Sequence, residues 1–323
     1  TNSYFFFFKH LVYVSIGIII IFIFSSLNAD QLFKYSVFLF FVFFFSLFLV
    51  PIIGVEVKGS KRWIDLFFLP RFQPIEVLKP FLIVVLATIF YSNRANILFK
   101  YLLSFILISI ISFLLIIQPD IGQTLLVVFL WIVLIFTSGI NMYILFAIFV
   151  LGSSLITYLI MYVPKFDYIQ GRIFSFFNRE AGSHNFQSDK AIDSITSGGF
   201  FGKGIGEGTL KNRVPEAHTD YIISVISEEF GVVAIILILL LFLIFIYMVF
   251  KKISIEADDK IKLILIGSIS LILMQTTIHV GVNIRLFPTT GMTLPFLSYG
   301  GSSIVSTSIL AGIILNLTKR KIN

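Results

Sequence analysis

The sequence predicts an all-α polytopic membrane protein with about nine transmembrane helices. Of its 323 residues 58% are hydrophobic, only 13% are charged, and the charged residues gather between long apolar runs. A helix needs about 20 apolar residues to cross a bilayer core of about 30 Å. This composition excludes a water-soluble enzyme and a disordered chain. We expect the net charge of +7 to attract anionic lipid head groups or phosphorylated substrates rather than nucleic acid.

Nine apolar runs, each bounded by charge, Gly, Asn or Pro, are long enough to be spanning helices. A transmembrane β-barrel is not expected, because its strands alternate in polarity over about ten residues, whereas these runs are continuously apolar. We therefore expect one transmembrane domain over residues 1–323, with function concentrated in a long loop at 164–220. The predicted spans are 10–27, 33–53, 73–91, 100–117, 120–138, 142–163, 221–250, 261–283 and 301–318.

Charge in the short connections predicts the orientation. With nine spans, the basic segments at Lys100, Lys251 and Lys319 lie on the same side of the membrane. That side should be cytoplasmic. The two longer segments, 54–72 and 164–220, then lie outside, although they too are rich in Lys and Arg. We expect this charge to attract an anionic ligand; the alternative is that long loops are translocated regardless of charge.

The helix predicted after Pro74 places ionisable groups inside the membrane. Proline suits a first helical turn, so Gln73, Glu76 and Lys79 follow at three-residue steps and share one face. Lys79 then lies about 9 Å along the axis from Gln73, at 1.5 Å per residue. An ammonium at that depth is costly unless it is paired or hydrated, so Glu76 and Lys79 are candidate site residues. The alternative is a purely structural ion pair.

Two further polar stretches lie between apolar runs. Asp120 follows Gln118 and Pro119 with almost no loop, where it is either an N-cap or a site residue. The stretch 197–208 has six glycines around Lys203. Such glycines let backbone N–H groups approach an anion, as in phosphate-binding loops. Because no Ser or Thr follows Gly-Lys, a flexible loop is an equal alternative.

The helix predicted at 221–250 follows a polar segment that ends in Thr219 and Asp220, either of which could cap it. Glu228 and Glu229 lie two turns inside this helix, where acidic side chains should face a cavity or a partner. Further on, Pro and Gly interrupt the apolar segment 287–303. Irregular backbone at membrane depth is tolerated only where it lines protein or a water-filled cavity.

Taken together, these motifs closely resemble the SEDS family of peptidoglycan polymerases, whose members include FtsW and RodA. Ala217 before His218 is similar to FtsW more than to RodA. Ile75 and Gln123 depart from the family's usual residues without removing a titratable group. Family members usually have ten spans, and the resemblance implies that the first is missing here. The matching stretches come in the family's order: 59–64, 73–79, 118–122, 197–208, 215–231 and 288–303.

The resemblance implies a glycosyltransferase that polymerises lipid II on the outer face of the bacterial cytoplasmic membrane during septal cell-wall synthesis. A sugar hydroxyl must attack an anomeric carbon while pyrophosphate leaves, which requires a base and nearby cations. Asp220 matches the family's essential Asp and is the implied catalytic base, with inversion at the anomeric carbon. The implied substrate-binding residues are Arg62, Arg71, Glu76, Lys79, Asp120, Lys203, His218 and Ser302.

The resemblance also implies partners and alternatives. A bound Mg²⁺ or Mn²⁺ would share the neutralisation of pyrophosphate, and no organic cofactor is expected. The sequence has no Ser-x-x-Lys nucleophile motif, so a class B penicillin-binding protein, alongside other divisome proteins, would supply the transpeptidase. The alternatives are a lipid II flippase, an elongation polymerase of the RodA type and a noncatalytic scaffold. Asp220 distinguishes a polymerase from a flippase, because a carrier needs no general base.

Overall fold

The computed structural model describes residues 3–57, 60–65, 70–92, 96–177 and 186–319. Gly59 of the first motif and residues 178–185 of the long loop lie outside them. Two short strands pair antiparallel, with Val57 opposite Ser60, Glu56 opposite Lys61 and Val55 opposite Trp63. The elements are α1 (Ser3–Ser26), α2 (Ala29–Ile53), β1 (Val55–Val57), β2 (Ser60–Trp63), α3 (Pro74–Phe90), α4 (Ile97–Ile117), α5 (Ile121–Thr137), α6 (Met142–Tyr162), η1 (Pro164–Phe166), α7 (Asp167–Phe177), α8 (Phe186–Gly198), η2 (Leu210–Arg213), α9 (Ile222–Ile253), α10 (Asp259–Asn283) and α11 (Gly301–Thr318).

Each of the nine predicted spans is a helix within the described residues, which confirms a polytopic α-helical membrane protein. Seven helices are long and apolar enough to cross a bilayer, namely α1, α2, α4, α6, α9, α10 and α11. The other two, α3 and α5, have 17 residues each. Both are shorter than the predicted spans 73–91 and 120–138. At their N-terminal ends Gln73 and Asp120 lie just before the helices, and at their C-terminal ends the apolar runs continue into turns.

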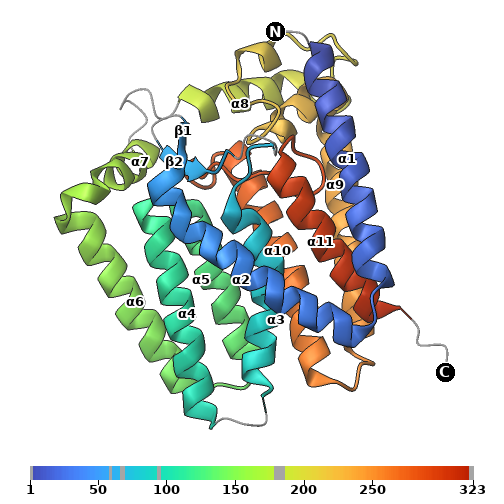
Figure 1. Cartoon of the computed structure of the whole chain (residues 1–323). Coiled ribbons are helices and arrows are strands. Elements are labelled where there is room, and N and C mark those ends of the chain that lie inside the picture. The colour runs from blue at the N-terminus through green and yellow to red at the C-terminus, as the bar shows by residue number, and fades with distance from the viewer. Residues whose placement is uncertain (1–2, 58–59, 66–69, 93–95, 178–185, 320–323) are drawn as a thin grey trace. The chain divides into compact units, whose positions relative to one another are not determined.

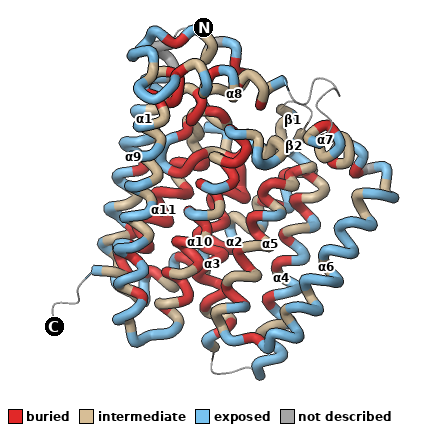
Figure 2. The backbone as a smooth tube through the Cα atoms, turned by 180° about the vertical axis from the view of Figure 1, so that it is seen from behind, coloured by how far each residue is buried: buried red, intermediate tan, exposed pale blue. Residues whose placement is uncertain are grey.

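The chain forms two compact units. Unit 1 contains Thr1–Ile135, Leu243–Gln275 and Thr293–Asn323. Within it α3 packs against α2, α4 and α11, and α1 lies along α11 (Figure 1). The helices α3 and α11 are mostly buried (Figure 2). Small residues permit the α1–α11 contact: a Cβ on Gly17 would lie 2.6 Å from Ser308 Oγ, and a Cβ on Gly312 would lie 2.6 Å from Phe24 Cβ.

Unit 2 contains Phe136–Phe242 and Thr276–Met292. No residue of α6 is buried (Figure 2). Most of its exposed side chains are aromatic or aliphatic, as suits contact with a bilayer. The predicted loop 164–220 is not irregular throughout, because α7 and α8 form within it. Of these, α7 packs against α6 and α8 packs against η2.

The helix α9, predicted as continuous, is broken at Gly231, whose φ of 79° no helix contains. The break exposes main-chain groups that the glycine-rich stretch satisfies. Val232 N–H donates to the Gly199 carbonyl at 3.0 Å, and Lys203 N–H donates to the Glu228 carbonyl at 2.9 Å. A Cβ on Gly231 would lie 2.1 Å from the Phe200 carbonyl oxygen, so only glycine permits this approach. The glycine-rich stretch is therefore an inserted segment with a fixed structure.

Candidate functional site

In unit 1, the first turns of α3 place a buried cation beside a buried carboxylate. Lys79 Nζ lies 3.0 Å from Glu76 Oε1, with side chains 1% and 7% exposed. It also donates to Gln123 Oε1 on α5 at 2.9 Å, and the Gln123 amide donates in turn to Glu76. The sequence prediction that these groups share one face of a helix starting at Pro74 is confirmed. A buried charge needs such partners, and this triangle gives the Lys79 ammonium a carboxylate and an amide oxygen.

A second group of polar contacts adjoins the start of α3. Gln73 Nε2 donates to Asp120 Oδ2 at 2.8 Å, and Arg62 Nη1 lies 3.7 Å from Asp120 Oδ1. Arg62 also donates to the carbonyls of Gln118, at 3.2 Å, and Pro119. Asp120 Oδ1 accepts the Gln123 N–H at 3.4 Å, so Asp120 both caps α5 and joins the cluster. The N-cap interpretation of Asp120 is confirmed, and its role in a substrate site stays a prediction.

The Asp120 carboxyl lies in the turn between α4 and α5, outside both helices. Its burial raises its pKa above the ordinary range, against the opposing attraction of Arg62. Ser302, at the start of α11, accepts the Gln73 N–H at 2.9 Å, and Ser306 Oγ donates to the Glu76 carbonyl at 2.6 Å. Helix α11 therefore fixes the main chain of α3 at its ionisable turn. We call Arg62, Gln73, Glu76, Lys79, Asp120, Gln123 and Ser302 the α3 cluster.

Arg71 differs from the arginine of the α3 cluster. Its side chain is 58% exposed and its Nε lies 2.7 Å from Asp65 Oδ2. Arg62, by contrast, is 21% exposed and faces two main-chain carbonyls. Of the two, Arg71 is the guanidinium that a ligand can reach without displacing buried partners.

In unit 2, Asp220 lies in the turn that leads into α9 and is half-buried. Its N–H donates to the Glu216 carbonyl at 3.1 Å, and its carbonyl accepts from Asn283 Nδ2 on α10 at 3.0 Å. A Cβ on Gly291 would lie 3.7 Å from Asp220 Oδ2. The predicted base is therefore a partly exposed carboxylate on a main chain held from two sides. His218, two residues earlier, is exposed.

The other predicted cation of unit 2, Lys203, lies 3.7 Å from Glu228 Oε1. Glu228 is fully enclosed and also accepts from the main-chain N–H groups of Leu210, at 2.9 Å, and Lys211, at 2.6 Å. Ser194 Oγ donates to it at 3.0 Å. The expectation that the acids of α9 face a partner is confirmed. The anion that these loop amides contact is a carboxylate of the same chain.

Sequence reasoning missed two residues of these arrangements. Gln123 attracted notice only as a departure from a family pattern, although its place three residues after Asp120 predicts a shared helix face. Asn283 gave no signal, because a polar residue near the end of an apolar run is typical of a helix terminus.

Neither unit offers an evident metal site within the described residues. No three side chains of His, Asp or Glu gather there. Glu76 and Asp120 already contact cations and amides, and Glu228 contacts N–H groups and a lysine. These carboxylates do not form a divalent-cation site as arranged.

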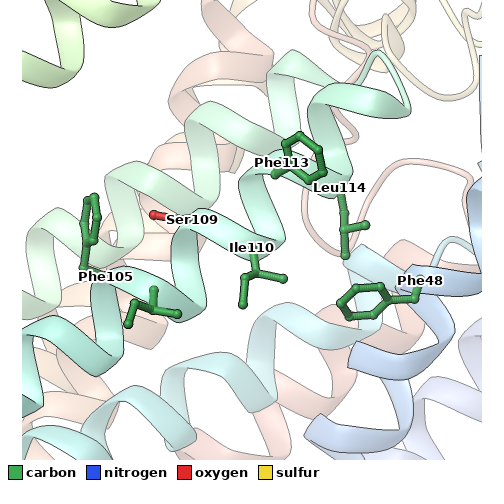
Figure 3. A pocket seen from close by; sticks show the side chains of 7 residues that line it. Phe48, Phe105, Ser109, Ile110, Phe113 and Leu114 are labelled. Carbon is green, nitrogen blue, oxygen red and sulfur yellow. The ribbon is translucent and has the colours of Figure 1, made fainter.

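Unit 1 also has an apolar hollow of about 500 Å³ between α2 and α4, lined by hydrocarbon and one hydroxyl (Figure 3). It has no titratable group and so no means of acid–base chemistry. Its lining residues are Phe48, Phe105, Ile106, Ser109, Ile110, Phe113 and Leu114.

Comparison with known proteins places the sequence among cell cycle proteins. The family model for FtsW, RodA and SpoVE, described as cell cycle protein, matches residues 1–323. The chain is 33% identical to the probable peptidoglycan glycosyltransferase FtsW of Coxiella burnetii, over 97% of this chain and 86% of the relative. It is 32% identical to the protein of the same name in Caulobacter vibrioides, over 84% of this chain and 69% of the relative.

Solved structures agree in fold. The rod shape determining protein RodA of Thermus thermophilus superposes with a TM-score of 0.69 at 26% identity, covering 96% of this chain and 86% of that chain. A chain of a peptidoglycan synthase complex superposes with a TM-score of 0.78 at 24% identity, covering 98% and 90%. The polytopic architecture is therefore shared across nearly the whole length.

Proposed function

The chain belongs to the family of cell cycle proteins that includes FtsW, RodA and SpoVE, and on that premise we propose that it polymerises lipid II during cell division. It is a peptidoglycan glycosyltransferase, in keeping with the names of its relatives. The observation that supports the chemistry best is Asp220, a half-buried carboxylate at the start of α9 whose main chain is fixed on both sides. A general base needs both access to its substrate and a fixed position.

The reaction assigned to Asp220 is a single displacement. The hydroxyl oxygen of the acceptor sugar attacks the anomeric carbon of the lipid-linked strand, and its proton passes to the Asp220 carboxylate. The bond from the anomeric carbon to the pyrophosphate oxygen breaks, and polyprenyl pyrophosphate leaves with that electron pair. Attack from the face opposite the leaving group inverts the configuration, so an α-linked donor gives a β-linked product.

The leaving pyrophosphate needs cations, and we assign Arg71 the first contact. Its guanidinium is exposed and can form bidentate bonds to phosphate oxygens. Arg62 and Lys79 are the other proposed cations; in the α3 cluster Arg62 lies beside Asp120 and Lys79 beside Glu76. Gln73 bonds Asp120, and Ser302 holds the Gln73 main chain. Lys203 and His218 are the remaining predicted contacts, in unit 2.

A divalent cation is a separate proposal. Mg²⁺ or Mn²⁺ would help to neutralise the leaving pyrophosphate, although Glu76, Asp120 and Glu228 already have partners and are not arranged to hold it. No step above depends on it.

We place the protein in the bacterial cytoplasmic membrane with its active face outside, where lipid-linked precursors are polymerised. Its proposed partner is a class B penicillin-binding protein, because one relative in fold is a chain of a peptidoglycan synthase complex. Helix α6, exposed along its whole length, has surface available to a partner's single span or to lipid.

The experiment that tests the function is incubation of the purified protein with lipid II, with and without the partner, followed by separation of glycan polymers. Polymer in the presence of lipid II supports the proposal. A transporter would instead move fluorescent lipid II across vesicles without polymer, and that result would replace the proposal.

A further inference from the structure

We propose that the last two turns of α10 position the candidate base, with Asn283 fixing the main chain of Asp220 and His279 fixing the loop that faces it. Both are positioning residues and neither touches the reacting atoms. The inference rests on the proposed function, because it concerns how accurately Asp220 meets the acceptor hydroxyl. All the contacts below lie within unit 2.

Asn283 bonds the main chain of Asp220 from a buried position. It is fully enclosed, and its Nδ2 donates to the Asp220 carbonyl at 3.0 Å and to the His279 carbonyl at 2.8 Å. One amide nitrogen has two hydrogens, so both are used. A directional hydrogen bond, and not only packing, therefore holds the main chain of Asp220 at the end of α10.

His279 fixes the segment between α10 and α11 at Met292. Its Nδ1 lies 2.8 Å from the Met292 carbonyl, and the ring is buried. A carbonyl only accepts, so Nδ1 must donate, which sets the tautomer and leaves Nε2 as an acceptor. The bond joins α10 to Met292, in the segment between α10 and α11.

The segment that His279 fixes is the one beside the carboxylate. Gly291 precedes Met292, has a φ of +72°, and would place a Cβ 3.7 Å from Asp220 Oδ2. Any movement of Met292 therefore changes the surroundings of the carboxylate directly. Together, the two side chains set the Asp220 main chain and the backbone opposite its carboxylate. Catalytic geometry tolerates little error, and a displacement of about 1 Å can cost about a hundredfold in rate.

Another buried asparagine provides a matched control. Asn316, on α11 in unit 1, donates through Nδ2 to the carbonyls of Phe24 at 2.8 Å and Leu27 at 2.6 Å. It ties a helix to a main-chain turn as Asn283 does, but it contacts none of the proposed site residues. A merely structural role predicts the same result for the two asparagines.

The test measures kcat and KM for lipid II polymerisation, with thermal unfolding, for Asn283→Ala and Asn316→Ala. We expect both to lower the melting temperature, and Asn283→Ala alone to lower kcat, by about tenfold or more with KM within about twofold. If Asn283→Ala does not fold, Asn283→Leu keeps the volume and takes its place. A kcat no lower than that of Asn316→Ala would overturn the role of Asn283.

The histidine is tested by donor rescue. His279→Phe keeps a ring without a donor and should lower kcat, whereas His279→Asn keeps an N–H donor and should recover part of the loss. Equal kcat in these two variants would overturn the role of His279. Asp220→Asn is measured in parallel: if that variant polymerises normally, the base assignment fails, whereas a dead Asp220→Asn beside a normal Asn283→Ala refutes only the positioning.

Discussion

The ammonium of Lys79 lies 3.0 Å from the carboxylate of Glu76, three residues earlier on α3, and both side chains are almost fully enclosed. This pair explains how an apolar span accommodates two charges, because each neutralises the other and Gln123 hydrogen-bonds both. Because of this pairing, a substitution of Lys79 alone would change stability as well as any contact with substrate. Removing Lys79 alone leaves a buried carboxylate without its cation.

We therefore expect Lys79→Met to destabilise the protein by about 3–5 kcal/mol, because an uncompensated buried charge is costly. The double variant Lys79→Met with Glu76→Gln should regain most of that stability. Thermal unfolding in detergent measures both. The double variant is then assayed with lipid II. Loss of polymerisation despite restored stability supports a substrate role for the pair, and full activity would show that the pair is purely structural.

The two arginines before α3 should respond differently. Arg62 contacts two main-chain carbonyls and Asp120, so Arg62→Ala should lower the melting temperature, at a cost of about 1–3 kcal/mol for the groups left unpaired. Arg71 forms an exposed pair with Asp65, worth about 0–1 kcal/mol, so Arg71→Ala should unfold like the parent.

Arg71→Ala should nevertheless raise KM for lipid II severalfold, because it removes the accessible contact to pyrophosphate. Asp65→Ala, which deletes the other half of the pair, is the control and should leave KM near the parent value. An unchanged KM in Arg71→Ala would remove Arg71 from the substrate-binding residues.

The insertion at the break in α9 predicts a glycine-specific effect. Gly231→Ala would place a Cβ 2.1 Å from the Phe200 carbonyl oxygen and would force a non-glycine residue to a φ of 79°. We expect a loss of at least about 1–3 kcal/mol and faster proteolysis of the inserted segment. Gly152→Ala, in α6, has nothing within 4 Å and is the control. Equal melting temperatures for the two variants would contradict the inserted geometry.

The sequence predicted the helices well because bilayer-spanning runs are long and continuously apolar. It also predicted that Glu76 and Lys79 share one helix face. Pro74 marks the first turn of the helix, and residues spaced three apart lie on the same side of it. It failed where structure depends on distant partners. The break at Gly231 depends on Gly199 and Phe200, which lie about thirty residues earlier, and an apolar run alone gives no sign of it. The partners of Asp120 and Asp220 lie far away in the sequence: Arg62 of β2 and Gln73 before α3 for Asp120, and Asn283 of α10 for Asp220.

Partner dependence gives a further prediction. Titrating a class B penicillin-binding protein with an inactive transpeptidase site into the purified protein should increase glycan synthesis and reach saturation. The physical reason is that a partner which binds the active conformation more tightly than other conformations raises its population. Synthesis that is already maximal without the partner, and unchanged on adding it, would refute activation while leaving the polymerase assignment intact.

The central claim is that Asp220 accepts the proton of the acceptor hydroxyl. The most direct test compares polymer yield from lipid II for the parent, Asp220→Asn and Asp193→Asn. The last variant removes an exposed carboxylate of α8 that pairs with Lys190 at 3.1 Å, and it should polymerise normally. We expect Asp220→Asn to fold, insert into the membrane and bind lipid II but to yield no polymer, because its amide cannot accept the proton. Near-parental polymer yield from Asp220→Asn would contradict it.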